Sequence, residues 1–267
     1  MKLSVITICK NVGINIEKTL LSIINQTYKN IEIIVIDGNS CDDTISYINN
    51  YCKQINHFIS EDDSGIYQAM NKGLKLATGD LIYFLNAGDV FFDDNVVEKI
   101  IVEFKNNKRI DIIYGNVETI DPNTNEVKKQ IYGRIFKTYF FFTCFVQQAM
   151  FFRSNCFKKV GFFDESFKIS GDYNWIVKGI LNNKLKMFYM DNFLCLFQLG
   201  GISSNDKFKT LHEKENNIIK NYFSKKDKFF IRKLKIKPFH FYEDYEQLTE
   251  EKISKKLIFK IIGWNLN

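Results

Sequence analysis

The first 115 residues alternate between short apolar runs and stretches with helical spacing, and this alternation constrains the fold more than any other feature. Strand-helix-strand alternation of this kind predicts an α/β fold, with a mainly parallel sheet and helices on both faces. The expected strands are 3–9, 31–36, 57–60, 81–85 and 110–114, and the expected helices are 14–26, 42–53, 66–77 and 95–106.

After residue 115 the pattern is less regular. Residues 117–132 have the pattern of a hairpin around Asp121–Pro122–Asn123, and a Gly-Asp turn at 171–172 precedes an expected helix over 173–181. Neither a GxGxxG dinucleotide fingerprint nor a GxxxxGK[ST] phosphate loop is present in the sequence. The second part of the chain therefore has to be interpreted from individual motifs.

Composition narrows the class of protein. The chain has 267 residues, of which 45% are hydrophobic, enough for one sizeable core. Six cysteines form no CxxC pair, which favours reduced thiols in a cytoplasmic protein and disfavours a zinc site. The most apolar stretch, 139–152, is interrupted by Gln147 and Gln148 and is shorter than the roughly 18 residues of a spanning helix. We expect no transmembrane segment.

Polar residues follow each of the first four expected strands. Because ligands of open α/β sheets bind outside the carboxyl ends of the strands, these residues predict a binding site. Asn, Gly and Asp are also ordinary turn formers, so any one cluster alone has a simpler explanation. The four clusters are Lys10–Asn11, Asp37–Ser40, Glu61–Gly65 and Asn86–Asp89.

These clusters, in this order, resemble the family 2 glycosyltransferases of the GT-A fold. The matching stretches lie between residues 2 and 204: "SVITICKN", "IEIIVIDGNSCDDT", "SEDDSGIYQAMNKGLKLATGDLIYFLNAGD", "GFFDESFKISGDYNW" and "LGGISS". The resemblance is strongest to bacterial polysaccharide transferases that extend O-antigen, capsule or similar glycans. It implies inverting transfer of a sugar from a nucleotide-diphosphate donor, with Mg²⁺ or Mn²⁺ neutralising the leaving diphosphate.

Asp89 is the residue that the resemblance assigns to the metal. Many relatives have two adjacent acids or an Asp-x-Asp at this point, whereas this chain has Asn86, Gly88 and a single carboxylate. The contact that an upstream acid often makes with the donor ribose cannot be made by Gly88. We therefore expect either weaker metal binding or a metal site that depends on the diphosphate and on water.

The resemblance assigns nucleotide contacts to Thr7, Asp37 and Asp63. Asp37 would accept a hydrogen bond from the base, which favours uracil, and Asp63 would line the same pocket; Thr7 would touch the base from the first strand. For Asp37 the alternative is an ordinary Asp-Gly turn. Asn71 and Gly73 are expected to shape how the third helix packs under the pocket.

Asp172 in "SGDYNW" matches the catalytic base of the family. An inverting transfer needs one group that deprotonates the acceptor hydroxyl, and a single carboxylate opposite the leaving group is sufficient. The alternative is a helix N-cap, since Gly171 and Asp172 precede the expected helix.

Further candidates lie on the acceptor side. Gln147 stands where relatives often have His, and it is expected near the acceptor. Gly200, Gly201 and Ser203 are expected to form a loop that closes over the diphosphate, with a plain turn as the alternative.

The expected organisation is a catalytic domain over 1–204, with a nucleotide-binding half of about 1–115 and an acceptor half of 116–204, followed by a basic, aromatic extension over 205–267. Residues 201–267 hold 15 Lys and Arg against 9 Asp and Glu, whereas residues 1–200 hold 22 of each. The segment 220–237 could bind nucleic acid by residue type, but the resemblance favours an anionic membrane surface. A solvated basic helix is the alternative.

We therefore expect a cytoplasmic transferase at the inner face of the cell membrane, acting on a glycan acceptor carried by polyprenyl diphosphate, and binding no nucleic acid. Two other functions stay open at this point. A nucleotidyltransferase would need a Gly-rich basic phosphate loop, which residues 2–17 lack. A carbohydrate- or lipid-binding protein that has lost transferase activity would explain the single carboxylate of the motif Asn86–Asp89, but it would not explain the presence of Asp172.

Overall fold

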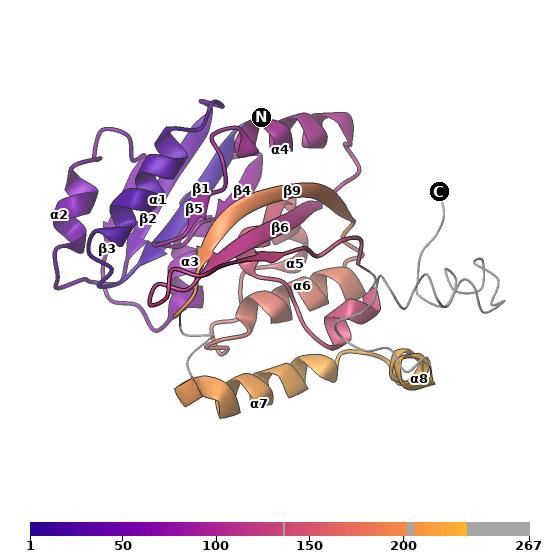
Figure 1. Ribbon diagram of the computed structural model, residues 1–267. Coiled ribbons are helices and arrows are strands. Elements are labelled where there is room, and N and C mark those ends of the chain that lie inside the picture. The colour runs from indigo at the N-terminus through magenta and orange to yellow at the C-terminus, as the bar shows by residue number, and fades with distance from the viewer. Residues whose placement is uncertain (136, 202–205, 234–267) are drawn as a thin grey trace.

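The computed structural model describes residues 1–135, 137–201 and 206–233, and Figure 1 shows their arrangement. The elements of the first part of the chain are β1 (Leu3–Cys9), α1 (Asn15–Ile24), β2 (Ile31–Asp37), α2 (Thr44–Asn49), β3 (His57–Ser60), α3 (Ile66–Leu76), β4 (Leu81–Phe84), β5 (Val90–Phe91) and α4 (Val96–Asn106). Those of the second part are β6 (Ile112–Ile120), β7 (Val127–Gln130), η1 (Lys137–Phe141), η2 (Gln147–Ala149), β8 (Met150–Arg153), α5 (Asn155–Val160), α6 (Gly171–Leu181), β9 (Met187–Gln198), η4 (Asp206–Phe208), α7 (Lys209–Lys220) and α8 (Lys225–Lys233).

One mixed sheet runs through the molecule in the order β3-β2-β1-β4-β8-β6-β9-β5, with β7 paired to β6. Strands β3, β2, β1 and β4 are parallel to one another. Strand β8 is antiparallel to both β4 and β6, whereas β9 runs parallel to β6. The predicted α/β class with a mostly parallel sheet is confirmed, and the alternating first part of the chain forms its parallel section.

Helix α3 packs closely on β1 and β2, and this contact explains one of its residues. A Cβ added at Gly73 would overlap the side chain of Ile6 in β1, so the helix can approach the strand only with glycine there. Asn71, two residues earlier, donates to the carbonyl oxygen of Phe163 at 3.0 Å and accepts from the Phe163 N–H at 3.0 Å. Both residues shape the packing of α3, as the sequence predicted.

The strands that the sequence did not predict belong to the second part of the sheet. Strand β8 is only four residues long and follows directly after Gln147–Ala149, and β9 is half-buried along most of its length. Neither strand has the alternation of apolar and polar residues by which a strand is recognised. The predicted hairpin is present, because β6 pairs with β7 across the turn at Asp121. The strand expected at 110–114 begins two residues later, at Ile112, and continues into the hairpin as the single strand β6.

Helix α7 lies against α6 on the side away from the sheet, along the bottom of Figure 1. Ile219 and Phe223 are 0% and 3% exposed and belong to the same hydrophobic core as the strands. The division of the chain at residue 204 stays a prediction. Within the three described ranges, none of the helices combines the length and apolar character needed to cross a bilayer.

Candidate active site

The four predicted polar clusters lie at one edge of the parallel section of the sheet. Cys9 in β1 is in register with Asp37 in β2, and Asp37 is in register with Ser60 in β3. The chain beyond β4 continues beside β1, since the Ala87 N–H donates to the Ile8 carbonyl oxygen at 3.2 Å. The clusters after β1, β2, β3 and β4 are thereby brought together at the carboxyl ends of these strands.

Asp63 lies directly beside the loop that follows Asp37. A Cβ added at Gly38 would come within 2.6 Å of Asp63 Oδ2 and within 3.2 Å of Cδ of Lys10. The other carboxylate oxygen of Asp63 accepts from the Gly65 N–H at 3.0 Å. Asp37 and Asp63, which are 26 positions apart in sequence, thus border the same small region of the surface.

The carboxylate of Asp37 is fully buried and is surrounded by donors from its own neighbourhood. It accepts from the Ser40 N–H at 2.9 Å, from the hydroxyls of Ser40 and Ser60 at 2.5 and 2.7 Å, and from Cys9 Sγ at 3.5 Å. Burial alone would raise the pKa of Asp37, but these hydrogen bonds outweigh it and hold the pKa below its usual value. Asp37 therefore fixes the shape of the loop after β2, and a nucleotide base would have to replace one of these donors.

Two oxygen atoms near these strand ends are buried and have no hydrogen-bond partner among the described residues. They are Oγ1 of Thr7, in β1, and Oδ1 of Asn86, just beyond β4. Buried polar atoms in native structures are usually paired, so an unpaired one requires an explanation. A bound ligand or ion would provide one for both atoms.

The turn that carries Asp89 is held by residues from three other segments. The hydroxyl of Thr19, in α1, accepts from the Gly88 N–H at 2.9 Å and donates to the Asp89 carbonyl oxygen at 2.8 Å. The Asp89 carboxylate accepts from Gln148 Nε2 at 2.6 Å and from the Gln198 N–H at 2.9 Å. Burial raises the pKa of Asp89 to about 7, and these two hydrogen bonds only partly oppose that rise.

The fit of these residues to a divalent cation can be tested on the donor atoms. Asp89 supplies one carboxylate, and the unpaired Oδ1 of Asn86 is a second oxygen of the kind that Mg²⁺ and Mn²⁺ accept. The described part of the chain holds no group of three or more His, Cys, Asp or Glu side chains able to bind a metal by themselves. The residues therefore suit a cation that takes most of its ligands from a diphosphate and from water.

Asp172 lies in the first turn of α6, where it is half-buried. Its Oδ1 lies 3.0 Å from the hydroxyl of Tyr67, which also lies 2.6 Å from the Ile169 carbonyl oxygen. Burial raises the pKa of Asp172, opposed by the Tyr173 N–H, the Tyr67 hydroxyl and the nearby His212. Since α6 begins at Gly171 and its N-cap residue is Ser170, Asp172 is not the cap of the helix.

Tyr67 and its surroundings connect Asp172 to the strand-end cluster. The ring of Tyr67 occupies the space beside Gly171, where an added Cβ would come within 2.6 Å of ring atom Cε2. Lys168 Nζ donates to the Ser64 carbonyl oxygen at 3.1 Å, and Ser64 follows Asp63 directly. Asp172 and Asp63 therefore belong to segments that are in contact, although more than 100 residues separate them.

The structure describes three of the four remaining predicted residues, Gln147, Gly200 and Gly201. Gln147 is 5% exposed, and its Nε2 has no partner among the described residues. The contact to the Asp89 turn is made by its neighbour Gln148. Gly200, with φ of 101°, and Gly201 come two and three residues after Gln198, whose N–H donates to Asp89, so their loop begins near the Asp89 turn. Ser203 lies outside the described residues.

Sequence reasoning missed Tyr67, Gln148 and Gln198 as parts of this site. Tyr67 lies within the family-like stretch "SGIYQAMNKG", and that stretch was the available signal for it. For the two glutamines no local signal exists, because each reaches Asp89 from a segment 59 or 109 positions away.

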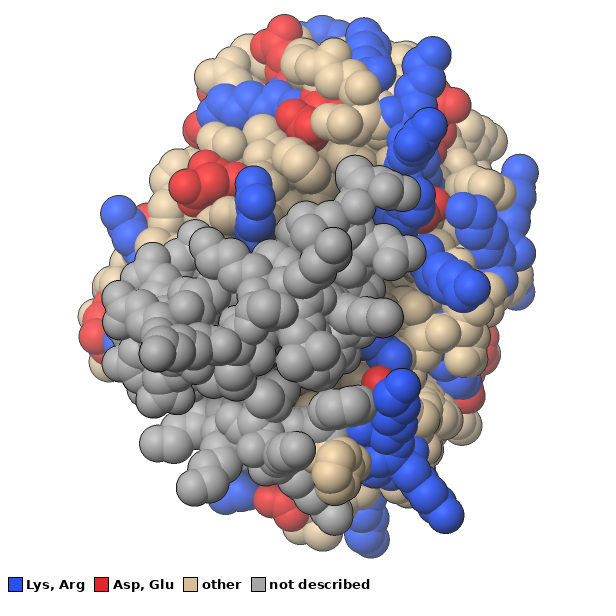
Figure 2. Space-filling view, turned by 90° about the vertical axis from the view of Figure 1, so that its right-hand side faces the viewer, with Lys and Arg blue, Asp and Glu red and all other residues tan. Residues whose placement is uncertain are grey.

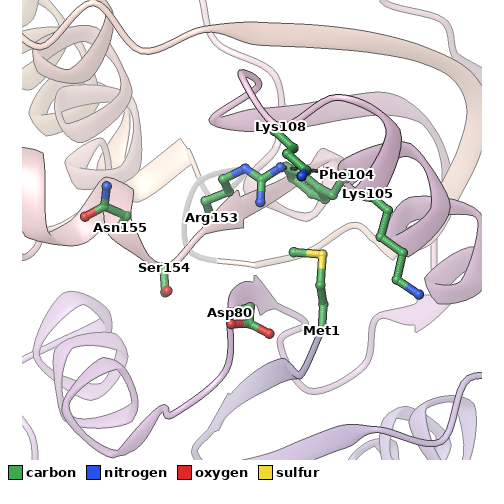
Figure 3. A pocket seen from close by; sticks show the side chains of 8 residues that line it. All are labelled: Met1, Asp80, Phe104, Lys105, Lys108, Arg153, Ser154 and Asn155. Carbon is green, nitrogen blue, oxygen red and sulfur yellow. Dashed lines mark hydrogen bonds between the residues drawn. The ribbon is translucent and has the colours of Figure 1, made fainter.

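A pocket elsewhere on the molecule is distinct from this region. It has a volume of about 580 Å³ and lies at the opposite edge of the sheet, where Met1 precedes β1 and Asp80 precedes β4 (Figure 3). Its Arg153 donates to the carbonyl oxygens of Ile110 and Phe104 and stacks 4.8 Å from the Phe104 ring centre. Arg153 thus supports the end of α4, and the geometry gives this pocket no place in the candidate site.

Comparison with known proteins identifies the family. The sequence model of one family, glycosyl transferase family 2, matches residues 4–167. An uncharacterised glycosyltransferase of Mycobacterium tuberculosis is 30% identical over 203 residues, which cover 76% of this chain and 77% of that protein. A PGL/p-HBAD biosynthesis glycosyltransferase of Mycobacterium bovis is 26% identical over 207 residues, or 75% of this chain and 78% of that protein.

Solved structures share the fold at low sequence identity. The S. aureus TarS structure with UDP-GlcNAc has a TM-score of 0.63 at 18% identity and covers 75% of this chain. The mannosyltransferase PcManGT of Pyrobaculum calidifontis, with GDP-Man and Mn²⁺, has a TM-score of 0.60 at 16% identity and covers 76% of this chain. The present chain spans 59% of the TarS chain and 58% of the PcManGT chain.

Proposed function

Since this chain is a member of glycosyl transferase family 2, we propose that it moves a sugar from a UDP-sugar to a glycan acceptor with inversion at the anomeric carbon. The observation that carries the proposal is the contact between the segment that leads to Asp172 and the segment that follows Asp63. Tyr67 and Lys168 bring the segment of Asp172 against the segment of Asp63, so one carboxylate can face an acceptor while the others face a donor.

Asp172 is the proposed base. As the acceptor hydroxyl oxygen bonds to the anomeric carbon, the bond from that carbon to the diphosphate oxygen breaks and the hydroxyl proton passes to Asp172. A general base works best when its pKa lies near the working pH, and burial moves the pKa of Asp172 upward.

Thr7, Asp37 and Asp63 are proposed to form the nucleotide side of the site. The structure of TarS contains UDP-GlcNAc and that of PcManGT contains GDP-Man, so the shared fold accepts more than one base. We favour uracil because its imide N–H can donate to a carboxylate such as Asp37. Such a contact would displace one of the serine hydroxyls that Asp37 binds in the free protein.

Asp89, together with Oδ1 of Asn86, is proposed to hold Mg²⁺ or Mn²⁺. When bound, the cation would offset the negative charge of the leaving diphosphate. Asp89 has a pKa of about 7 in the free protein, so cation binding would favour its ionised form and release a proton near neutral pH. Gln147, Gly200, Gly201 and Ser203 are kept as proposed acceptor and loop residues.

The acceptor is proposed to be a glycan on polyprenyl diphosphate, reached from the inner face of the cell membrane. The described part of the basic segment includes α8, where Lys225 and Lys226 are exposed, and Figure 2 shows basic side chains gathered on that side of the molecule. Phe229 is 61% exposed, but Phe223 and Ile231 are 3% exposed. Phe223 and Ile231 are therefore buried in the protein and are not available to enter a bilayer. Residues 234–237 of the segment lie outside the described residues.

Membrane contact is tested by sedimentation with vesicles that contain anionic phospholipid. Each basic residue near such a surface contributes roughly 1 kcal/mol, so binding should be lost when Lys225, Lys226 and Lys228 are replaced by Gln, or at high salt. Neutral vesicles are the control. A parent protein that stays in the supernatant at low salt contradicts the membrane proposal and leaves a solvated basic helix.

The reaction itself is tested by thermal unfolding with UDP-sugars and GDP-sugars, each with and without Mn²⁺, since a bound ligand raises stability by mass action. The stabilising donor is then used for transfer, and the anomeric configuration of the product is read by NMR. We expect a UDP-sugar to stabilise only with Mn²⁺ present and the product to be inverted. A retained configuration, or no stabilisation by any nucleotide sugar, contradicts the proposal.

A further inference from the structure

The segment 161–170, which leads into the helix carrying Asp172, is held between two helices. On one side is α3, whose Asn71 binds both backbone groups of Phe163 and whose Tyr67 hydroxyl lies 2.6 Å from the Ile169 carbonyl oxygen. On the other side is α7, which follows the part of the chain matched by the family. Asp172 therefore depends on a segment with two separate supports.

The support from α7 comes mainly from one carboxylate, that of Glu215. Glu215 is 5% exposed and accepts three backbone N–H groups: from Lys168 at 2.7 Å, from Ile169 at 3.1 Å and from Ser170 at 2.7 Å. The next residue, Asn216, accepts from the Ser170 hydroxyl at 2.9 Å. Successive backbone N–H groups that converge in this way form an anion-binding concavity, and here a side chain of the same molecule occupies it.

These contacts have an electrostatic reason to be strong. Hydrogen bonds to an ionised carboxylate are about twice as strong as those between neutral groups. The carboxylate also lies beside the first residues of α6, where the helix dipole favours negative charge. The conformation of residues 168–170 is therefore tied to the position of α7.

One peptide group connects Glu215 to Asp172, through the hydroxyl of Tyr67. The Ile169–Ser170 peptide donates its N–H to Glu215 and presents its carbonyl oxygen to the Tyr67 hydroxyl, and that hydroxyl also lies 3.0 Å from Asp172 Oδ1. The tyrosine has one proton, which it can donate either to the peptide or to Asp172. Because hydrogen bonds in a chain polarise one another, the hydrogen bond to Glu215 affects the strength of the hydrogen bond between Tyr67 and Asp172.

We propose that Glu215 is a positioning residue for Asp172, acting through the Ile169–Ser170 peptide and Tyr67. The inference rests on the proposed role of Asp172 as the base. It makes α7 a part of the acceptor side of the site, although α7 supplies no atom to the reaction. Misplacement of a reacting group by about 1 Å can lower a rate about 100-fold. A change in α7 that moves Asp172 should therefore lower kcat while leaving donor binding unchanged.

The test compares Glu215→Gln with Glu213→Gln, which makes the same change of charge at an exposed position of the same helix. We expect Glu215→Gln to lower kcat at least about tenfold with less than about a twofold change in the KM for the donor. Glu213→Gln should match the parent. Combined with Asp172→Asn, Glu215→Gln should lower the residual rate no further, because it acts through Asp172.

Three results separate the inference from the proposed function. If Asp172→Asn is inactive but Glu215→Gln equals Glu213→Gln, the positioning role is wrong. If Glu215→Gln lowers the residual rate of Asp172→Asn by the same factor as that of the parent, Glu215 has only a general structural role. If Asp172→Asn turns over like the parent, the proposed base is wrong and the inference fails with it.

A second variant keeps the inference testable if Glu215→Gln does not fold. Tyr67→Phe retains the ring beside Gly171 and removes only the hydroxyl that joins Ile169 to Asp172. It should also lower kcat with little effect on the KM for the donor. Turnover equal to that of the parent would overturn the proposed connection.

Discussion

The donor side and the acceptor side of the candidate site are built in different ways. At the strand ends, Asp37 is held by Ser40, three residues away, and Asp63 by Gly65, two residues away. Around Asp172, the contacts come from Tyr67, 105 residues earlier, and the preceding segment is held by Glu215, 45 to 47 residues later. The acids of the nucleotide loops are thus held partly by near neighbours in sequence, whereas Asp172 is held from distant segments, as is Asp89 by Gln148 and Gln198.

This difference bears on the electrostatics of the buried acids. Asp37 has several hydrogen-bond donors close in sequence or on the adjacent strand, and its pKa is lowered. Asp89 has two donors, both from distant segments, and burial raises its pKa to about 7. A carboxylate with many donors serves as a fixed structural anion, whereas one with few donors remains able to gain a cation or a proton.

The largest effect that we predict is on the acceptor side. Asp172→Asn keeps the shape of the side chain but removes the base, so transfer should fall by about 100-fold or more, the range for general base catalysis. The KM for the donor should stay near that of the parent. The check is steady-state transfer with varied donor; a rate within threefold of the parent would refute the role.

On the donor side, Asp37→Ala should lower the free energy of unfolding by about 3 kcal/mol, because it leaves the Ser40 and Ser60 donors without an acceptor. It should raise the KM for the donor more than it lowers kcat. Urea unfolding and donor kinetics measure both effects. Asp43→Ala, at an exposed acid nearby, is the control and should change neither quantity.

The lowered pKa of Asp37 also gives the sign of its pH dependence. Its stabilising contribution is present above the usual Asp pKa of about 4 and is lost as the pH falls through the lower folded-state value. Asp37→Ala should thus lower the free energy of unfolding by a smaller amount at low pH than at neutral pH. An unchanged difference in stability between pH 7 and pH 3 would count against this account of Asp37.

Asp89 should show the opposite dependence in the free protein. Its pKa is raised to about 7, so between pH 4 and 7 the folded protein holds a proton that the unfolded chain has released. Stability should therefore fall as the pH rises through this range, by at most about 1.4 kcal/mol per pH unit. Asp89→Asn should remove that slope, and Asp94→Asn, an exposed acid nearby, should keep it.

The smallest effect is expected at Thr7. Its buried hydroxyl has no partner among the described residues, so Thr7→Val should change the free energy of unfolding by less than about 0.5 kcal/mol. If the hydroxyl meets the nucleotide base, the same variant should raise the KM for the donor. A loss of stability above about 1 kcal/mol would mean that the hydroxyl is paired in the free protein.

Most of the first half of the fold could be predicted from the sequence. Strands β1 and β3 have the predicted bounds, and the carboxyl ends of parallel strands must share one edge, so the convergence of Asp37 and Asp63 followed. The sequence also directed attention to Asp172, through a motif that opens a helix. These predictions rest on periodicity, on turn residues and on order along the chain.

The rest depended on contacts that no local pattern encodes. Gln148, Gln198 and Glu215 each reach the site across 45 or more residues, and each lies in an element whose own sequence gives no reason to single it out. Strand β9 carries Gln198 but lacks alternation, and it was missed for that reason. Only the folded chain shows which of several glutamines and glutamates contact Asp89 or the segment that leads to Asp172.

We propose above all that the acids at the strand ends, including Asp89, bind the donor, whereas Asp172 acts on the acceptor and does not contribute to donor binding. Titration calorimetry of UDP into the parent, Asp89→Ala and Asp172→Asn, with Mn²⁺ and with a chelator, tests it most directly. We predict Mn²⁺-dependent binding to the parent and to Asp172→Asn with equal affinity, and binding at least about tenfold weaker to Asp89→Ala. Equal affinity for all three proteins, with or without Mn²⁺, would contradict the account.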